Sequence, residues 1–318
     1  MTGGWAAIFF LADAGCRGAG RVTVDGVNQP VRISATPPDR PPGPARPRVP
    51  HEMAIRRLSV VAVERVTPGM VRITLAGIEL AGFESSGPTD HVKVFFPDPN
   101  TGELAVPTLT AEGMQPPGHG TPYPRDYTPR AFRELGASGG PELDLDLVLH
   151  DGGGPAAGWA SRAVVGQALV VAGPRGSKLI PEGFDSYLLA CDETALPAVA
   201  RWLELLPDGA PVRVLAEISS VDDEAYLPTL RGTEVLWLRR EGPPGTSQVL
   251  EHAVRACGTL GPRTYVWAGG EAGSLVGVRR HLRHGLGLPR RQVEVEGYWR
   301  RGTANFDHHA PIDPTDAD

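Results

Sequence analysis

The sequence predicts a fold of two parts, an antiparallel β-barrel followed by a parallel α/β domain. Its 318 residues exceed the length of one ordinary domain. Short strands separated by turns occupy the first part of the chain, which favours a small antiparallel barrel. After Pro181, strands alternate with helices, which indicates a parallel sheet. We therefore expect a barrel domain at residues 54–182 and an α/β domain at residues 183–304.

The barrel strands are predicted from β-rich composition and from the alternation of apolar and polar residues. In residues 70–75, Val71, Ile73 and Leu75 fall on one face, as in a strand that is buried on one side. The Pro- and Gly-rich stretch at residues 97–124 is expected to be a long loop. Four further strands are predicted at residues 58–66, 91–96, 143–150 and 167–172.

The α/β domain is predicted from short buried-type strands and segments with helical spacing. The strands are expected at residues 186–191, 212–218, 234–238 and 264–268. The helices are expected at residues 192–206, 247–256 and 273–284. This alternation is typical of a parallel sheet covered by helices.

Both ends of the chain are expected to be disordered. Residues 35–50 contain seven prolines and cannot bury a core, so residues 1–53 are interpreted as a disordered extension, with Met53 as an alternative natural start. No Lys or Arg precedes the short apolar run at residues 5–12, so we expect no export signal. The acidic residues 305–318 are expected to form a disordered tail.

Charge and cysteine content argue against several functions. Lys and Arg total 31 and Asp and Glu total 37, so the net charge is −6, whereas nucleic-acid binders usually carry a basic surface. No apolar run approaches the roughly 18 residues of a membrane span. The three cysteines are far apart, so we expect no disulfide framework, no cysteine-based metal site and a cytoplasmic location. His281 and His284, one helical turn apart on a basic helix, are interpreted as solvated, and neither they nor His308 and His309 in the acidic tail are expected to bind a metal.

One extended segment, Arg125-Asp-Tyr-Thr-Pro-Arg130, carries side chains suited to a flavin. A flavin requires an aromatic ring beside its own, a small hydrogen-bonding residue and a cation for its phosphates. Tyr127, Thr128 and Arg125 supply one of each on alternating sides of the segment. From this pattern alone, a solvated strand with surface arginines stays open as the alternative.

Two further segments carry residues suited to anionic ligands. After His150, glycines lead to Pro155, where a helix would begin, and backbone N–H groups at a helix start attract phosphate. An ordinary glycine turn before a helix is the alternative. The segment Gly297-Tyr-Trp-Arg-Arg-Gly302 combines two aromatic residues with two arginines, and it either meets a ligand or packs as a terminal strand.

Together, and in this order, these segments resemble the siderophore-interacting protein family of flavin reductases, also called ferric-siderophore reductases. The resemblance runs from about Ile55 to Gly302. No single marker is decisive, but their common order is specific. The markers are His91-Val-Lys-Val-Phe-Phe-Pro97, Arg125-Asp-Tyr-Thr-Pro-Arg130, Val148-Leu-His150 with Gly154-Pro-Ala156 and Trp159-Ala160, Gly173-Pro-Arg-Gly176, Asp192-Glu-Thr-Ala-Leu-Pro197, Ala268-Gly-Gly-Glu-Ala272 and Gly297-Tyr-Trp-Arg300.

The resemblance implies a ferredoxin-reductase-like architecture, with an FAD-binding barrel ahead of a nicotinamide-binding α/β domain. It implies no catalytic side chain and no metal ligand. The FAD contacts that it implies are Arg125, Tyr127, Thr128, Arg130, Asp146, Leu147, Val148, Leu149, His150, Ala156 and Ala157, with Tyr298 and Trp299 close to the flavin. The nicotinamide is expected to enter beside Asp192, Glu193 and Thr194.

The implied activity is transfer of electrons from NADH or NADPH through FAD to a ferric siderophore, with release of the iron as Fe(II). Because many ferric siderophores are anionic, Arg300, Arg301 and Lys178 are candidate substrate contacts. The acidic stretch at residues 218–224 slightly favours NADH. A general flavin reductase or diaphorase, and a siderophore-binding accessory protein with little turnover, remain as alternatives. The siderophore class and the oligomeric state stay open.

Overall fold

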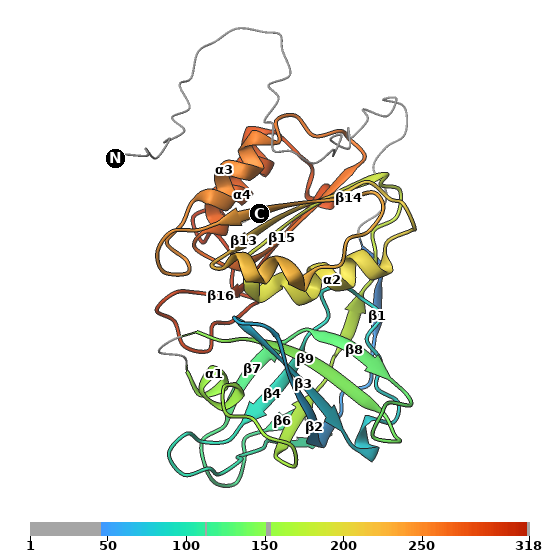
Figure 1. Cartoon of the computed structure of the whole chain (residues 1–318), viewed down its shortest axis with the longest axis vertical. Coiled ribbons are helices and arrows are strands. Elements are labelled where there is room, and N and C mark those ends of the chain that lie inside the picture. Colours follow the sequence, from blue (N-terminus) through green and yellow to red (C-terminus); the bar gives the residue numbers. More distant parts are fainter. Residues whose placement is uncertain (1–45, 112, 151–153, 317–318) are drawn as a thin grey trace, which may run out of the picture. The chain divides into compact units, whose positions relative to one another are not determined.

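The computed structural model describes residues 46–111, 113–150 and 154–316 (Figure 1). Most of the expected N-terminal extension, residues 1–45, lies outside the described residues, as do the glycine-rich residues 151–153. The predicted fold class is confirmed, because a seven-stranded antiparallel sheet is followed along the chain by a five-stranded parallel sheet.

The antiparallel sheet is an open barrel with the strand order β7-β4-β10-β2-β3-β9-β8. The outermost strands, β7 and β8, are consecutive in sequence and are joined by the single residue Thr128. Because both edges of the sheet meet at one residue, the sheet has to curl, and Thr128 lies at its seam. The strands are β2 (Ile55–Thr67), β3 (Met70–Ala76), β4 (Val92–Phe96), β7 (Tyr123–Tyr127), β8 (Pro129–Arg133), β9 (Glu142–Val148) and β10 (Ala168–Ala172).

Strand alternation places the barrel core as the sequence predicts. Ile73 and Leu75 of β3 are fully buried and lie opposite Leu145 and Leu143 of β9. All four belong to one apolar cluster, and full burial of each such side chain contributes about 1.5–3 kcal/mol. The smaller barrel elements are η1 (Ile78–Leu80), helix α1 (Pro155–Ala160) and the pair β5 (Thr108–Thr110) and β6 (Gly113–Gln115) within the expected long loop.

The parallel sheet has the strand order β14-β13-β12-β15-β16. The order reverses between β12 and β15, so the carboxyl ends of these two strands form the crevice at which such sheets bind ligands. The strands are β12 (Ser186–Cys191), β13 (Val212–Ile218), β14 (Thr233–Arg239), β15 (Thr264–Glu271) and β16 (Val293–Trp299).

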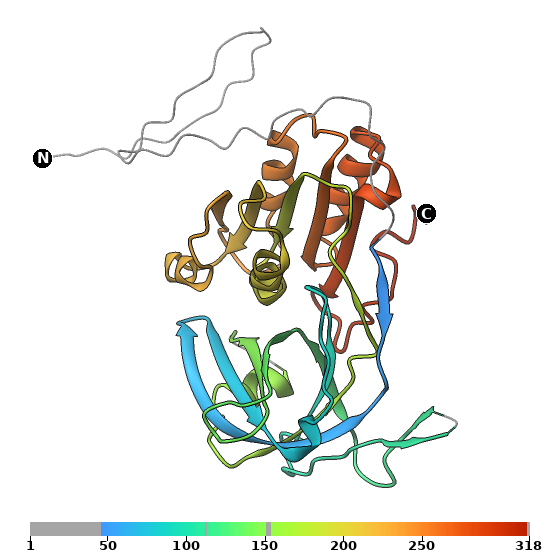
Figure 2. The ribbon, with the colours of Figure 1, turned by 90° about the vertical axis from the view of Figure 1, so that its right-hand side faces the viewer.

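Helices cover both faces of this sheet (Figures 1 and 2). Leu189 and Cys191 of β12 pack with α2 on one face, whereas Leu188 and Ala190 pack with α3 and α4 on the other. The predicted helix at 192–206 begins as a 3₁₀ turn, and the one at 273–284 ends in a π-helical turn. The elements are η2 (Glu193–Ala195), α2 (Leu196–Leu205), η3 (Val221–Tyr226), α3 (Val249–Ala256), α4 (Leu275–Arg280), η4 (His281–Gly285) and η5 (Arg290–Gln292).

The expectation of disorder is wrong for residues 46–53. Strand β1 (Arg48–Pro50) pairs with β11 (Gly176–Lys178). Arg46 is buried and its guanidinium donates to Glu294 Oε2 at 2.6 Å. The high proline content of the extension does not prevent order here, because backbone pairing and a buried ion pair fix its last residues.

The tail is also ordered as far as residue 316, contrary to the expectation. Ile312 is 7% exposed and packs in an apolar cluster of the α/β domain. Asp313 accepts a hydrogen bond from Arg280 of α4 at 2.5 Å, and Asp316 lies 2.6 Å from His284. The acidic residues that suggested disorder are therefore the partners of a basic helix.

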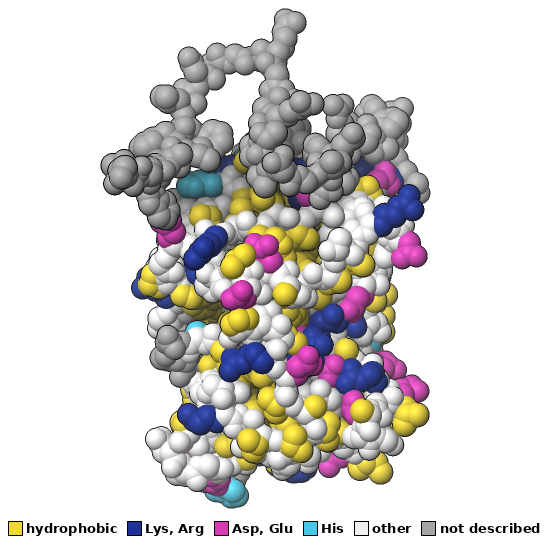
Figure 3. Space-filling model, viewed as in Figure 1, with side chains coloured by type: hydrophobic (Ala, Val, Ile, Leu, Met, Phe, Trp, Pro, Cys, Tyr) yellow, Lys and Arg dark blue, Asp and Glu magenta, His cyan; other side chains and the backbone are white. Residues whose placement is uncertain are grey.

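Charges of both signs are interspersed on the face shown in Figure 3. Within the described ranges, no helix has the length and apolar character needed to cross a bilayer. The same residues contain no group of three or more His, Cys, Asp or Glu side chains placed to hold a metal ion.

Candidate cofactor and substrate site

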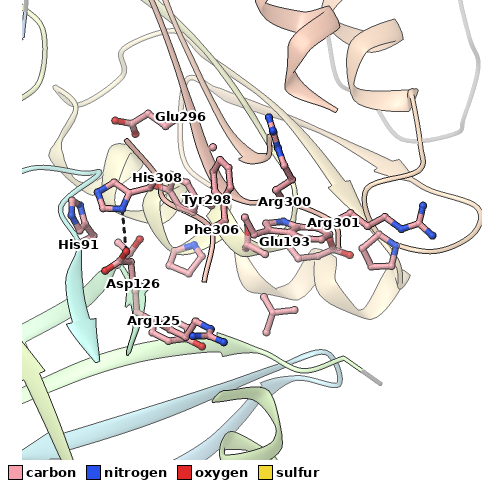
Figure 4. Close-up of a pocket in the computed structure, with 18 of the residues that line it drawn as sticks. His91, Arg125, Asp126, Glu193, Glu296, Tyr298, Arg300, Arg301, Phe306 and His308 are labelled. Carbon is pink, nitrogen blue, oxygen red and sulfur yellow. Dashed lines mark hydrogen bonds and ion pairs between the residues drawn. The ribbon is translucent and has the colours of Figure 1, made fainter. Parts of the chain in front are cut away.

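A large cavity lies between the barrel seam, the carboxyl edge of the parallel sheet and the C-terminal segment (Figure 4). Its volume is about 2190 Å³, compared with about 300–1,000 Å³ for a typical small-molecule pocket. Residues of β7, β9, η2 and β16 line it, together with residues 302–306 and 308–313. The cavity has room for a dinucleotide and a second ligand.

The predicted flavin segment contributes four residues to the cavity wall, namely Arg125, Asp126, Tyr127 and Thr128. The Tyr127 ring packs edge-to-face on Phe96 with the ring centroids 5.9 Å apart, and Phe96 packs on Trp159 of α1 at 5.4 Å. Burial raises the pKa of Tyr127, so its hydroxyl stays protonated. This aromatic row holds α1 beside β7.

Arg125 lies at the start of α1. A Cβ on Gly154 would lie 3.8 Å from Nη2 of Arg125, in ordinary van der Waals contact, so Gly154 lies directly beside this charge. Asn305 Oδ1 is 3.5 Å from Nη1 of Arg125, and Ala156 and Ala157 line the cavity nearby. Among the described residues no carboxylate pairs with Arg125, so its charge is free to meet an anion.

The other barrel residues that the resemblance implies divide into two groups. Leu147 is 2% exposed and points into the barrel core, because neighbouring residues of a strand face opposite sides. Arg130 pairs with Glu204 of α2 at 2.7 Å and does not line the cavity. The residues that do line it are Asp146, Val148, Leu149 and His150.

Two contacts join the barrel to the α/β domain beside the cavity. Asp146 accepts two hydrogen bonds from Arg72, both at 2.7 Å, and a third from Tyr226 of η3. Thr67 donates to Asp223 of η3 at 2.6 Å. Both Asp146 oxygens are thus committed to protein donors, and this carboxylate positions the wall of the cavity.

Asp192 fills the crevice between β12 and β15. Its Oδ1 accepts from the Thr194 amide at 2.9 Å, and its Oδ2 accepts from the Glu271 amide at 2.8 Å and from Trp299 Nε1 at 2.9 Å. A Cβ on Gly270 would lie 2.7 Å from this carboxylate. Burial raises the pKa of Asp192, although these donors oppose the shift. Asp192 therefore fastens β15 and β16 to the end of β12.

Glu193, the next residue, faces the cavity and is 7% exposed. Its Oε2 accepts a hydrogen bond from Arg240 Nη1 at 2.6 Å. Glu217 Oε1 lies 3.5 Å from the same nitrogen of Arg240. Burial raises the pKa of Glu217 to about 7, although Arg240 opposes the shift. Oε1 of Glu193 is shielded from water and has no donor among the described residues.

The end of β16 brings the predicted aromatic residues to the cavity. Tyr298 and Trp299 both line it. The Tyr298 hydroxyl interacts with the side chain of Thr128, and burial raises the pKa of Tyr298 well above its usual value. The last strand of the α/β domain is therefore joined directly to the barrel seam.

Arg300 and Arg301 follow these aromatic residues and also line the cavity. The Arg300 guanidinium lies over the ring of Phe306, 5.3 Å from its centroid. The Arg301 side chain is exposed, while its backbone N–H donates to Glu271 Oε1 at 3.0 Å. Figure 4 shows Arg300 near Tyr298, whereas the Arg301 side chain extends away from that ring.

The tail contributes cavity residues that the sequence interpretation missed. His308 Nδ1 lies 3.0 Å from Asp126 Oδ2, and Lys93 pairs with the other oxygen at 2.7 Å (Figure 4). Burial acts to raise the pKa of Asp126, but His308 and Lys93 outweigh it and lower this pKa to about 2. The His91 ring lies 4.3 Å from the His308 ring. The apolar residue Phe306 was the available signal that this tail packs.

Lys178 lines the cavity but is engaged by two carboxylates. Its Nζ lies 2.6 Å from Glu294 and 2.8 Å from Glu296. Burial acts to raise the pKa of Glu294, but Arg46 and Lys178 outweigh it and lower this pKa to about 2. The pKa of Glu296 is raised by burial and by Glu294. The four side chains form a cluster of balanced charge.

Two family models match the chain over these same parts. The siderophore-interacting FAD-binding domain matches residues 59–178, and the siderophore-interacting protein model matches residues 184–302. The chain belongs to the siderophore-interacting protein family. The resemblance stated from its markers is confirmed.

Relatives of this siderophore-interacting protein include two named reductases. The NADPH-dependent ferric-chelate reductase of Escherichia coli (strain K12) is 36% identical over 79% of this chain and 95% of that protein. Ferric vibriobactin reductase ViuB of Vibrio cholerae is 31% identical over 80% of this chain and 92% of that protein.

Solved structures of other proteins are similar to this chain. A siderophore utilization protein from T. fusca is 41% identical, with a TM-score of 0.77 over 83% of this chain and all of that one. Phthalate dioxygenase reductase is 15% identical, with a TM-score of 0.51 over 79% of this chain and 70% of that one, which shows the ferredoxin-reductase-like fold alone.

Proposed function

We propose that this siderophore-interacting protein is an FAD-dependent oxidoreductase that passes electrons from NADPH to ferric siderophores and releases the iron as Fe(II). The observation that carries the proposal is that the barrel seam and the carboxyl edge of the parallel sheet line one cavity. A flavin bound at the barrel seam and a nicotinamide bound at the carboxyl edge of the sheet would meet in this cavity. The names of the two reductase relatives support a ferric siderophore as the electron acceptor and NADPH as the electron donor.

The residues along the barrel seam fit FAD. Arg125 offers a charge without a carboxylate partner among the described residues, and a guanidinium can grip phosphate through two parallel hydrogen bonds. Gly154 lies beside it, and Tyr127 and Thr128 supply an aromatic ring and a hydroxyl. Helix α1 has only six residues, so we assign the phosphate site to Arg125 and not to the helix dipole.

FAD, when bound, supplies the chemistry that links a two-electron hydride donor to a one-electron iron acceptor. The residues of the chain position the partners. The contact of Tyr298 with Thr128 fixes the last strand against the seam, and Asp192 fixes the Trp299 ring. We propose that these two rings form a rigid wall that keeps water from the reacting groups.

We propose that Arg300 and Arg301 meet the anionic ferric siderophore. Both line the cavity, and the Arg301 side chain is exposed. A local excess of positive charge raises the concentration of an anionic substrate at a site. Lys178 is left out of this proposal, because Glu294 and Glu296 already neutralise its charge.

Anaerobic mixing tests the activity. NADPH is expected to bleach the FAD-loaded protein, and a ferric siderophore is then expected to restore the yellow colour while an Fe(II) chelator takes up the released iron. Stopped-flow absorbance measures both steps, with the iron-free siderophore as control. Reoxidation by free flavin but not by the ferric siderophore would indicate a general flavin reductase. A protein that NADPH does not bleach would be a binding accessory.

Arg239 is a candidate contact for the 2′-phosphate of NADPH, although the acidic stretch at 218–224 slightly favours NADH. Within that stretch, Asp223 is turned to the barrel, where Thr67 donates to it. Arg239 is exposed and lies beside Ile218, the last residue of β13. The end of this strand is where dinucleotide folds meet the ribose phosphate.

Replacing Arg239 with glutamine is therefore expected to raise KM for NADPH about tenfold and KM for NADH less than about twofold, since one charge-assisted hydrogen bond contributes about 1.5–3 kcal/mol. Steady-state kinetics with both donors measures the difference. Arg231→Gln is the matched control, because Arg231 is exposed at the opposite end of β14. An equal rise in both KM values would rule out a phosphate contact.

We also propose a cytoplasmic location. Cys191 and Cys257 are both free thiols, as is usual in a reducing compartment.

A further inference from the structure

Strand β14 forms one edge of the parallel sheet (Figure 1), and among the described strands it pairs with β13 alone. None of its seven residues is fully buried, and Leu236 at its centre is 48% exposed. The opposite edge strand, β16, is flanked by other parts of the chain, because Arg46 and Lys178 both contact its Glu294. The open edge of this sheet is therefore β14.

The sequence of β14 lacks the usual protection of a sheet edge. Proteins commonly place a charge, a proline or a bulge there, because the free backbone groups of an edge strand can pair with another chain. The central residues Val235-Leu-Trp-Leu238 contain neither a charge nor a proline. The register of β14 with β13 is continuous, so no bulge interrupts the strand. The edge is thus able to accept another strand.

Hydrogen bonds to β13 identify the backbone groups of β14 that face outward. The N–H of Arg240 donates to the carbonyl of Ile218 at 3.0 Å, and the carbonyl of Gly232 accepts from the first residue of β13 at 2.9 Å. The even-numbered residues therefore direct their backbone groups to β13. Because these directions alternate along a strand, Val235 and Trp237 direct theirs away from the sheet. These outward groups have no hydrogen-bond partner among the described residues.

A second copy of β14 fits this edge when the two strands run antiparallel and the twofold axis passes beside Leu236. Val235 would then exchange both of its outward hydrogen bonds with Trp237 of the second copy, and Trp237 with Val235 of that copy. Leu236 would face Leu236 of the second copy in a non-hydrogen-bonded pair, in which side chains approach most closely. The most exposed apolar side chain of the strand would thus be covered.

The charges at the two ends of β14 suit the same register. Arg231 lies two residues before the strand and Glu241 two residues after it, so each Arg231 would lie opposite Glu241 of the second copy. Both side chains are exposed, and neither has an ion-pair partner among the described residues. A shift of the pairing by two residues would instead place Arg231 opposite Arg239 or Pro243. The charges therefore favour the register that is centred on Leu236.

We infer that this protein forms a twofold-symmetric dimer through β14, which joins two five-stranded sheets into one continuous sheet. The carboxyl edges of the two sheets point in opposite directions in this pairing, so the two cavities lie at opposite ends of the joined sheet. A single strand pair is a small interface, and we expect a dissociation constant on the order of 10 µM. The association requires no electron transfer, so it is independent of the proposed function.

Sedimentation velocity of the FAD-loaded protein at about 1 to 300 µM tests the association. Wild type is expected to change from monomer to dimer over this range. Leu236→Lys is expected to remain a monomer, since two like charges would face each other across the axis. Ile78→Lys is the matched control, because Ile78 is 88% exposed on η1 of the barrel, and it is expected to associate as wild type does. Wild type that remains a monomer at the highest concentration would overturn the inference.

Reversing the end charges tests the register. Arg231→Glu is expected to raise the dissociation constant of the dimer about tenfold, because it replaces two exposed ion pairs with two repulsive pairs. Adding Glu241→Arg to this variant is expected to restore the wild-type value. If the double variant associated no better than Arg231→Glu alone, the pairing of β14 with its own copy would be wrong.

A disulfide tests the pair at the axis. Leu236→Cys is expected to form a covalent dimer on mild oxidation, because Cα atoms of a non-hydrogen-bonded pair are about 4.5 Å apart, within disulfide range. A non-reducing gel measures the covalent dimer. Oxidised wild type gives the background of the natural thiols, and Ile78→Cys gives that of random collision at an exposed site. A covalent dimer no more abundant in Leu236→Cys than in Ile78→Cys would contradict the inferred interface.

Discussion

Replacing Arg125 with alanine is expected to raise the dissociation constant for FAD at least about 100-fold, because two charge-assisted hydrogen bonds to phosphate are lost together. Arg125 lines the cavity beside Gly154. Its contacts with the protein are a backbone carbonyl and Asn305, so the fold is expected to survive. Fluorescence titration of the apoprotein with FAD measures the change.

Arg162→Ala is the matched control for this variant. Arg162 is exposed just after α1 and does not line the cavity, so its removal is expected to change the FAD dissociation constant less than about twofold. If Arg125→Ala bound FAD as tightly as wild type, the phosphate site would have to lie away from the barrel seam.

The fold was predictable because its signals are local. Alternation on β3 and β9 marks their buried faces within each strand, and the change from short strands to alternating strands and helices marks the parallel sheet. The seam was not predictable. Strands β7 and β8 are neighbours in the sequence but form opposite edges of one sheet. This arrangement follows from strand pairings that the sequence of a single strand does not reveal.

The candidate site was predictable where one strand supplies several side chains. Arg125, Tyr127 and Thr128 reach the cavity together because they are close in sequence. Arg130 does not, because its partner Glu204 lies on α2. The pairing of Lys178 could not be seen for the same reason, since its carboxylate partners are 116 and 118 residues away.

The ordered parts of both termini escaped prediction because composition hides specific pairing. The tail was expected to be disordered from its charge, yet Asp313 and Asp316 pair with the α4 region while Ile312 fills an apolar cluster. Arg46 was hidden in a proline-rich stretch, although burying an arginine requires a carboxylate and several acceptors that only the folded chain assembles.

Arg46→Ala is expected to lower the free energy of unfolding by about 3 kcal/mol, because breaking a buried ion pair leaves the partner uncompensated. The guanidinium pairs with Glu294, donates to the Leu179 carbonyl at 2.8 Å and lies 4.8 Å from the Trp202 ring centroid. Urea denaturation of the apoprotein measures the loss. Arg48→Ala, two residues along on an exposed strand, is expected to change it by less than about 0.5 kcal/mol.

The pH dependence of stability distinguishes the ion pair from packing on Trp202. Burial opposes ionisation of Glu294, but Arg46 and Lys178 lower its pKa from 4.5 to about 2. A lowered folded-state pKa stabilises the protein above pH 4.5, and that stabilisation is lost as the pH falls towards 2. Arg46→Ala is expected to flatten this acid-side loss. If Arg46→Ala lost the same free energy of unfolding at pH 7 and at acid pH, the role of Arg46 would be packing on Trp202.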